Sequence, residues 1–146
     1  SQGSINSIFI NNSISDALDS DFSKLDIKNI NVDGAGNDCS DFSFGNYKII
    51  LAEMKNCGDK ATSIGEKSKM EIENIVISNS FTGIASKDSS ETSIINSKIN
   101  DVKVCYASYK KKQEFSGGNI YIDNSECSNY NYLTRVDNFS SVKIKN

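Results

Sequence analysis

Apolar and polar residues alternate with a period of two in short segments along the chain, and most of these segments end in asparagine. The members are Ile8, Ile10 and Asn12; Leu25, Ile27 and Asn29; Met70, Ile72 and Asn74; Thr92, Ile94 and Asn96; Ile120, Ile122 and Asn124; and Val142, Ile144 and Asn146. Such alternation predicts β-strands with one buried face. The asparagines are 17, 45, 22, 28 and 22 residues apart, which indicates an internal repeat of about 22 residues.

The interval of 45 residues spans two repeats. Its missing member lies at Tyr47, Ile49 and Leu51, where the alternation continues but no asparagine follows in register. A second apolar position follows most of the asparagines by three residues, at Val32, Ile77, Ile99 and Cys127. Each repeat therefore consists of a strand, a bend and a second strand, and asparagine suits the bend because it tolerates the left-handed region.

This pattern predicts an all-β fold, a single-stranded right-handed parallel β-helix of about six coils with one coil per repeat. The handedness follows from the general rule for parallel crossover connections. We expect Ile27, Ile72, Ile94 and Ile122 to form one inward column. The alternative is an antiparallel β-sandwich. Its hairpins would need turn dipeptides, and only Asp33-Gly34 and Gly117-Gly118 provide them.

The composition agrees with a single β domain over residues 1–146. Isoleucine occurs 19 times and leucine four times, and β-branched residues favour strands. The chain has no histidine, so Ser-His-Asp hydrolysis, Cys-His proteolysis and histidine-based zinc catalysis are excluded. It begins with Ser1 and has no signal-peptide pattern, and we therefore expect a fragment of a longer protein.

Charge and hydropathy exclude two classes of partner. No run approaches the roughly 18 apolar residues of a membrane span. The formal net charge of −3 argues against nucleic-acid binding, which needs clustered positive charge. The only basic run, Lys110 to Lys112, is expected to be a solvated loop.

Acidic residues recur in the segments between the repeats. The position four residues before each first strand residue is Asp21, Ser43, Glu66 and then Asp88. Stacked coils would place Asp21, Glu66 and Asp88 on one face. We expect Lys60 and Lys87 to lie close enough to pair with these carboxylates, with Asp59 nearby.

Five strings resemble successive coils of a known repeat family. They are DALDSDFS (16–23), NDCSDFS (37–43), GDKATSIGEKS (58–68), GIASKDSS (83–90) and YKKKQEFSGG (109–118), of which 58–68 is the most specific. They are similar to a right-handed parallel β-helix repeat family of bacterial and archaeal cell-surface proteins. That family belongs to the pectate-lyase-like superfamily, and some members are joined to a spore-coat-kinase-like domain. The resemblance implies an extracellular or cell-surface location.

Enzymes of that superfamily resemble one another in holding calcium with carboxylates and in using Lys, Arg or Tyr for proton transfer at a sugar carbon. The corresponding metal ligands here would be Asp19, Asp21, Asp38 and Asp41. The face that meets a ligand would carry Asp59, Lys60, Glu66, Lys87 and Asp88. Calcium is the ion that such oxygen ligands favour.

We nevertheless expect a non-catalytic surface module whose long face meets a glycan, an ion or a partner protein, and we assign no catalytic residue and no cofactor. Asp59 and Asp88 adjoin Lys60 and Lys87 in sequence and should raise the pKa of both lysines, which is the wrong direction for a base. A calcium-dependent polysaccharide lyase or epimerase is one alternative. A structural segment of a fibrous surface assembly, with end-to-end self-association, is another.

The four cysteines leave their redox state open. Cys39 and Cys57, and likewise Cys105 and Cys127, are about one coil apart, so either pair could form a disulfide between neighbouring coils. The absence of a CxxC pair argues against zinc. Because neighbouring coils are already joined by backbone hydrogen bonds, free thiols within the core are favoured.

Overall fold

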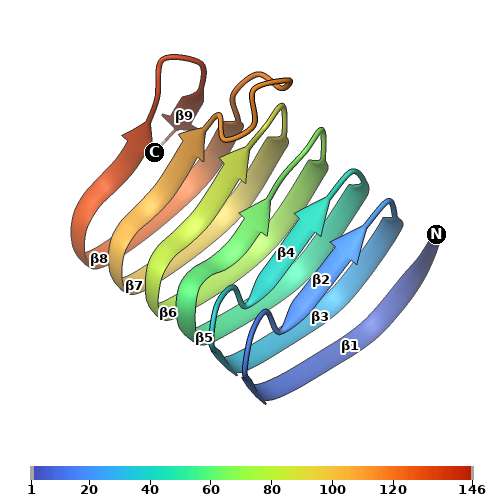
Figure 1. Ribbon diagram of the computed structural model, residues 1–146. Coiled ribbons are helices and arrows are strands. Elements are labelled where there is room, and N and C mark those ends of the chain that lie inside the picture. Colours follow the sequence, from blue (N-terminus) through green and yellow to red (C-terminus); the bar gives the residue numbers. More distant parts are fainter. Residues whose placement is uncertain (1, 146) are drawn as a thin grey trace.

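The chain winds into a right-handed parallel β-helix of about six coils, as the computed structural model, which describes residues 2–145, shows (Figure 1). The strands are β1 (Gln2–Ser13), β2 (Leu18–Asp21), β3 (Lys24–Ala35), β4 (Ser40–Ser43), β5 (Asn46–Ile64), β6 (Lys69–Lys87), β7 (Glu91–Tyr109), β8 (Asn119–Val136) and β9 (Ser141–Ile144). All of them pair in parallel, in the order β1-β3-β5-β6-β7-β8-β9, and β2 and β4 extend the sheet beside β5. This topology confirms the predicted fold and excludes the β-sandwich.

The coils are regular in length. The first residues of successive coils pair with one another, and they are Gln2, Lys24, Asn46, Lys69, Glu91, Asn119 and Ser141. The steps between them are 22, 22, 23, 22, 28 and 22 residues. The additional residues of the longest coil lie in the irregular segment between β7 and β8.

The predicted inward column is confirmed. Ile27, Ile72, Ile94 and Ile122 stack in register with Ile49 between the first two, and none is more than 2% exposed. A second inward column contains Val32, Met54, Ile77 and Ile99 and ends at the partly buried Cys127.

The position of the first repeat was predicted wrongly. Ser7, and not Asn12, pairs with Asn29, so the first interval is also 22 residues. Asn12 belongs to a different column at the next corner, whose members are Asn12, Gly34, Asn56, Asn79, Asp101 and Asn129. All six have positive φ, between 52° and 97°, so this column supplies the left-handed bend.

The other asparagine column forms an amide ladder. Asn96 donates to the Oδ1 of Asn74 at 3.1 Å, and Asn124 donates to the Oδ1 of Asn96 at 3.1 Å. These residues do not have positive φ, so their role is to link coils and not to form the left-handed bend. Asn146, the last predicted member, lies outside the described residues.

The cysteines divide into two states. Cys39 and Cys57 form a disulfide between neighbouring coils, with a Cα–Cα distance of 5.4 Å, so the preference for free thiols is wrong for this pair. The corner brings the two Cβ atoms together although the strands are already hydrogen-bonded. Cys105 and Cys127 are free.

Candidate functional site

Six of the nine charged residues predicted to form a site lie on β2, β4 and the second halves of β5 and β6, and Asp38, Glu66 and Asp88 lie within two residues of an end of these strands. One face of the rod is the outer surface of β2, β4 and the second halves of β5 to β8. These are the strand segments that carry the arrowheads in Figure 1. Phe42, Ile64 and Ile84 point into the core, so the alternate positions face outward. One outward column consists of Asp19, Asp41, Ser63, Ala85, Ala107 and Arg135. We call this surface the charged face.

The outward-facing residues at the centre of the charged face are small and buried. Ser63, Ala85 and Ala107 are at most 4% exposed although they point away from the core. Ala85 and Ala107 form a small apolar cluster with Val104, against which Tyr109 packs.

Three carboxylates meet at the N-terminal end of the charged face. Asp16, Asp38 and Asp41 place one oxygen each within 4.8 Å of one another, an arrangement that could hold a hard cation such as calcium. Burial is the main cause that raises the pKa of Asp38 and of Asp41. Neighbouring carboxylates add to this effect, since a negative charge disfavours ionisation of the next one.

The structure thus brings together two of the four predicted metal ligands. Asp19 pairs with Asp41 in the sheet but is exposed, and Asp21 is exposed two residues further along. Asp16 was not predicted. It stands 22 residues, or one coil, before Asp38, and this spacing was the sequence signal that could have identified it. The Oδ1 of Asp16 accepts the backbone N–H of Asp38 at 3.0 Å.

Lys60 is an ion-paired lysine. Its Nζ lies 2.8 Å from Asp59 Oδ2 and 3.8 Å from Asp38 Oδ1. Burial lowers the pKa of Lys60, but the hydrogen bond to Asp59 and the nearby Tyr109 and Asp38 outweigh burial, so the pKa is raised. The predicted rise in the pKa of Lys60 is confirmed.

The pKa of Lys87 is shifted in the opposite direction, so the predicted rise in its pKa is wrong. Its side chain is 7% exposed and forms no ion pair within 4.0 Å among residues 2–145. Burial, followed by the positive charges of Lys60 and Lys111, lowers its pKa, and the attraction of Asp41 does not compensate. The adjacent Asp88 uses its Oδ1 to accept the N–H groups of Lys111 and Lys112, both at 2.8 Å.

Asp21, Glu66 and Asp88 lie along the corner that follows the charged face. The N–H of Phe44 donates to the carbonyl oxygen of Glu66, and the N–H of Lys67 donates to that of Asp88. Only Asp21 is exposed, whereas Glu66 and Asp88 are buried. Glu66 pairs with Lys112 at 3.2 Å, so the expected pairing with Lys60 or Lys87 is wrong.

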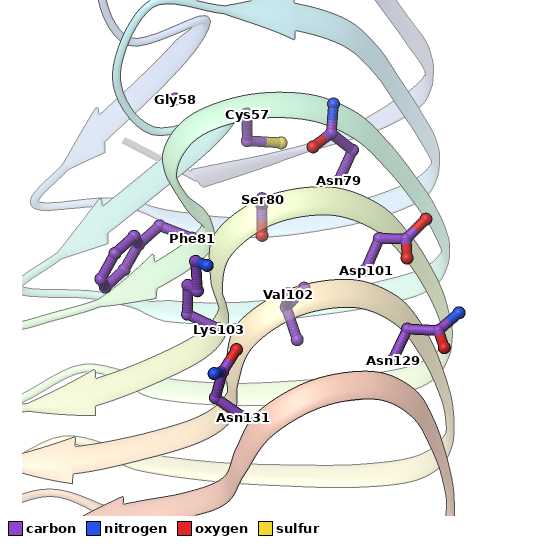
Figure 2. Close-up of a pocket in the computed structure, with 10 residues that line it drawn as sticks. All are labelled: Cys57, Gly58, Asn79, Ser80, Phe81, Asp101, Val102, Lys103, Asn129 and Asn131. Atoms are coloured by element: carbon purple, nitrogen blue, oxygen red, sulfur yellow. The ribbon is translucent and has the colours of Figure 1, made fainter.

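A groove that the sequence analysis missed runs across several coils at the preceding corner. Figure 2 shows that Asn79, Asp101 and Asn129 follow one another along one wall, and Phe81, Lys103 and Asn131 along the other. Cys57, Gly58, Ser80 and Val102 also line it, and its volume is about 460 Å³. The recurrence of Asn or Asp in the column with positive φ was the sequence signal that could have revealed this groove.

The comparisons with known proteins leave the family open. No protein-family model matches the chain, and no curated protein and no solved structure matches it significantly. Within residues 2–145 there is no helix of the length and apolarity that crossing a membrane requires. The chain is thus described by its fold and by these two surfaces.

Proposed function

We propose that this chain is a non-catalytic β-helix module of an extracellular or cell-surface protein, and that it binds a glycan in the groove of Figure 2. The observation that carries the proposal is the chemistry of the groove. It presents amide, carboxylate and ammonium groups from successive coils beside one aromatic ring, Phe81, that is 49% exposed.

Each component has a counterpart on a sugar. Asn79, Asn129 and Asn131 supply amides that both donate to and accept from hydroxyl groups. Asp101 accepts and Lys103 donates, so the groove also suits a glycan with a charged substituent. The ring of Phe81 offers an apolar face on which a sugar ring can stack. A volume of about 460 Å³ lies within the ordinary range for small-ligand sites.

Two observations support the proposed location and family. The Cys39–Cys57 disulfide is the kind of bond that persists in oxidising compartments, which include the cell exterior. The right-handed parallel coils agree with the resemblance to surface-protein repeats, which runs from about residue 5 to the end of the chain. We therefore infer membership of the pectate-lyase-like superfamily, in which some related chains are joined to a spore-coat-kinase-like domain.

Binding can be tested with a panel of neutral and acidic oligosaccharides, followed by NMR titration or calorimetry. We expect Phe81→Ala and Asp101→Asn each to weaken binding by at least about tenfold, the loss of one good contact. Phe9→Ala is the matched control, because Phe9 is 68% exposed and lies outside the groove. Absence of binding across the panel, or binding that ignores both groove variants, would contradict the proposal.

A calcium-dependent polysaccharide lyase or epimerase is the second candidate, and one specific observation favours it. Lys87, whose pKa is lowered, lies on the same face as the cluster of Asp16, Asp38 and Asp41. A lysine base needs a lowered pKa, and calcium on the carboxylates could neutralise a uronate. Only Arg135 is available as an arginine clamp for the substrate carboxylate.

The two functions are separated by an assay for unsaturated uronate absorbance on alginate and pectin in the presence of calcium, with NMR of the product for epimerisation. The binding-module proposal predicts no turnover. Reproducible turnover that is lost in Lys87→Ala but retained in the exposed control Lys98→Ala would establish the enzyme instead.

A further inference from the structure

The two free thiols of the chain meet in the core between the fifth and sixth coils. Cys105 lies on β7 and is fully buried, and Cys127 lies on β8 and is partly buried. The two columns that they occupy face each other in the core: one coil earlier, a Cβ at Gly83, which pairs with Cys105, would lie 2.9 Å from Cδ1 of Ile99, which pairs with Cys127. Both belong to the main apolar cluster of the rod, so their neighbours hold the two sulfur atoms in place.

Hydroxyl groups surround this pair on one side. The Tyr106 hydroxyl lies 2.8 Å from Ser97 Oγ and 2.6 Å from Ser125 Oγ. Ser125 Oγ in turn lies 3.8 Å from Cys127 Sγ. The hydroxyl groups can donate to a thiolate at Cys127, whereas the other side of Cys105 is apolar.

The pair is therefore asymmetric. The interaction with Cys105 lowers the pKa of Cys127, with further help from Ser125 and Tyr106 and against the effect of burial. The interaction with Cys127, together with burial, raises the pKa of Cys105. Cys127 therefore ionises more readily than Cys105.

We propose that Cys105 and Cys127 form a second disulfide between coils when the protein meets an oxidant, and that Cys127 is the attacking thiol. The existing disulfide is a partial precedent within this chain. Cys39 and Cys105 occupy the same column, three coils apart, and Cys39 is joined to a cysteine of the following coil, although Cys57 and Cys127 stand in different columns. This inference is independent of the proposed glycan groove.

The reaction balances with a low-molecular-weight disulfide as oxidant. The Cys127 thiolate attacks one sulfur of that disulfide, a mixed disulfide forms and one small thiolate leaves. Cys105 then gives up its proton and attacks the Cys127 sulfur, which releases the second small thiol. Two protein thiols are oxidised to one disulfide, and the small disulfide is reduced to two thiols.

The bond would act near the C-terminal end of the described part of the rod. Within residues 2–145, β9 pairs only with residues 119–122 of β8, and residues 130–136 have a neighbouring strand on one side only. A covalent link from β7 to β8 would hold this last full coil on the rod. We expect oxidation to raise the thermal midpoint and to slow amide exchange in β8.

Peptide mapping of the intact chain tests the proposal. After incubation with oxidised glutathione, trypsin cleavage should release residues 104–110 joined to 113–135, since Lys103, Lys110, Lys112 and Arg135 flank the two cysteines. The joined peptides should separate on reduction. Residues 29–48 should be joined to 56–60 before and after the treatment, which provides an internal control.

Variants show which thiol attacks. In Cys105→Ser, Cys127 should accumulate the glutathione adduct. In Cys127→Ser, Cys105 should stay unmodified, and the oxidant should not change the thermal midpoint. Persistence of both thiols in the wild-type chain, a stable glutathione adduct on wild-type Cys127, or a bond to Cys39 or Cys57 would each overturn the proposal. The wild-type map decides the matter even where a variant fails to fold.

Discussion

At the scale of single residues, burial in this rod depends on which side of a strand a side chain takes. Ile94 and Ile95 are adjacent in sequence, yet their exposures are 2% and 47%. Ile94 lies between the equivalent isoleucines of the coils on either side, Ile72 and Ile122. The period-two pattern predicted the inward column correctly, because the position of a residue in the register decides which face of the strand its side chain takes, and therefore whether that side chain is buried.

Truncation of that column should be costly. Ile72 is 1% exposed and contacts the coils on both sides, so Ile72→Ala should reduce the free energy of unfolding by ~2–5 kcal/mol through lost burial and a residual cavity. Ile95→Ala is the matched control, with an expected change within ~0.5 kcal/mol. Urea denaturation monitored by circular dichroism measures both. Similar losses in the two variants would show that the assigned register is wrong.

The carboxylate of Asp41 should make stability depend on pH. Because burial raises its pKa in the folded state, the folded chain holds this proton more tightly than the unfolded chain does. Stability from this group therefore rises as the pH falls from neutral through the raised pKa, and levels off below the ordinary value of 3.8. Asp41→Asn should be more stable than the wild type at pH 7, and the advantage should shrink toward pH 3.

Thermal midpoints across pH 3–8 check this expectation, with the exposed Asp123→Asn as control. Calcium offers a second arm. An ion held by Asp16, Asp38 and Asp41 should raise the midpoint of the wild type at pH 7 more than that of Asp41→Asn. A destabilised Asp41→Asn without calcium would mean that attraction between Asp41 and Lys87 outweighs the cost of burial.

At the scale of elements, the segment between β7 and β8 departs most from the repeat. Its basic residues were expected to be solvated, and Lys111 is exposed, but the backbone of the segment docks on Asp88. Lys112 reaches Glu66, and Phe115 packs edge-on against Phe44 at 6.1 Å. These partners lie one to three coils away, and a repeat pattern carries no information about contacts made by an insertion.

Removal of the Asp88 side chain should release this segment. Asp88→Ala leaves two N–H groups without their charged acceptor, and we expect a loss of at least ~2 kcal/mol. Amide exchange at Lys111 and Lys112 should accelerate in parallel. Asp123→Ala should change neither quantity, since that side chain is exposed. Unchanged exchange at both amides would show that the segment is held by Phe115 and Glu66 alone.

A feature could be predicted from the sequence where it repeats from coil to coil, and it was missed where it depends on contacts between different coils. The number of coils, the coil length and the isoleucine columns follow from the repeat, and they were predicted. Two asparagine columns share one residue type, so Asn12 could not be assigned to the correct one without register. The state of Lys87 and the cluster with Asp16 depend on side chains from other coils, which no local pattern specifies.

At the scale of the whole molecule, both ends of the rod are open within the described residues. β1 pairs on one side only, and Ile14 beside it is 97% exposed. At the other end Leu133 and Val136 are 39% and 41% exposed. An unpaired edge can accept another strand, which is the contact that the third candidate function, a structural segment of a fibrous assembly, would require.

The same geometry predicts a gradient of local stability along the rod. In a solenoid each coil is stabilised mainly by its nearest neighbours, so β5, β6 and β7, which are paired on both sides, should exchange their amides most slowly. β1 and residues 130–136 should exchange fastest.

Hydrogen exchange followed by mass spectrometry at several protein concentrations tests this gradient. It also distinguishes a monomeric binding module from a segment that assembles end to end. For a monomeric binding module the gradient should not change with concentration, whereas end-to-end assembly would protect β1 and residues 130–136 as concentration rises. Equal protection of all coils would show instead that the rod opens as one unit, and that the nearest-neighbour description is wrong for this chain.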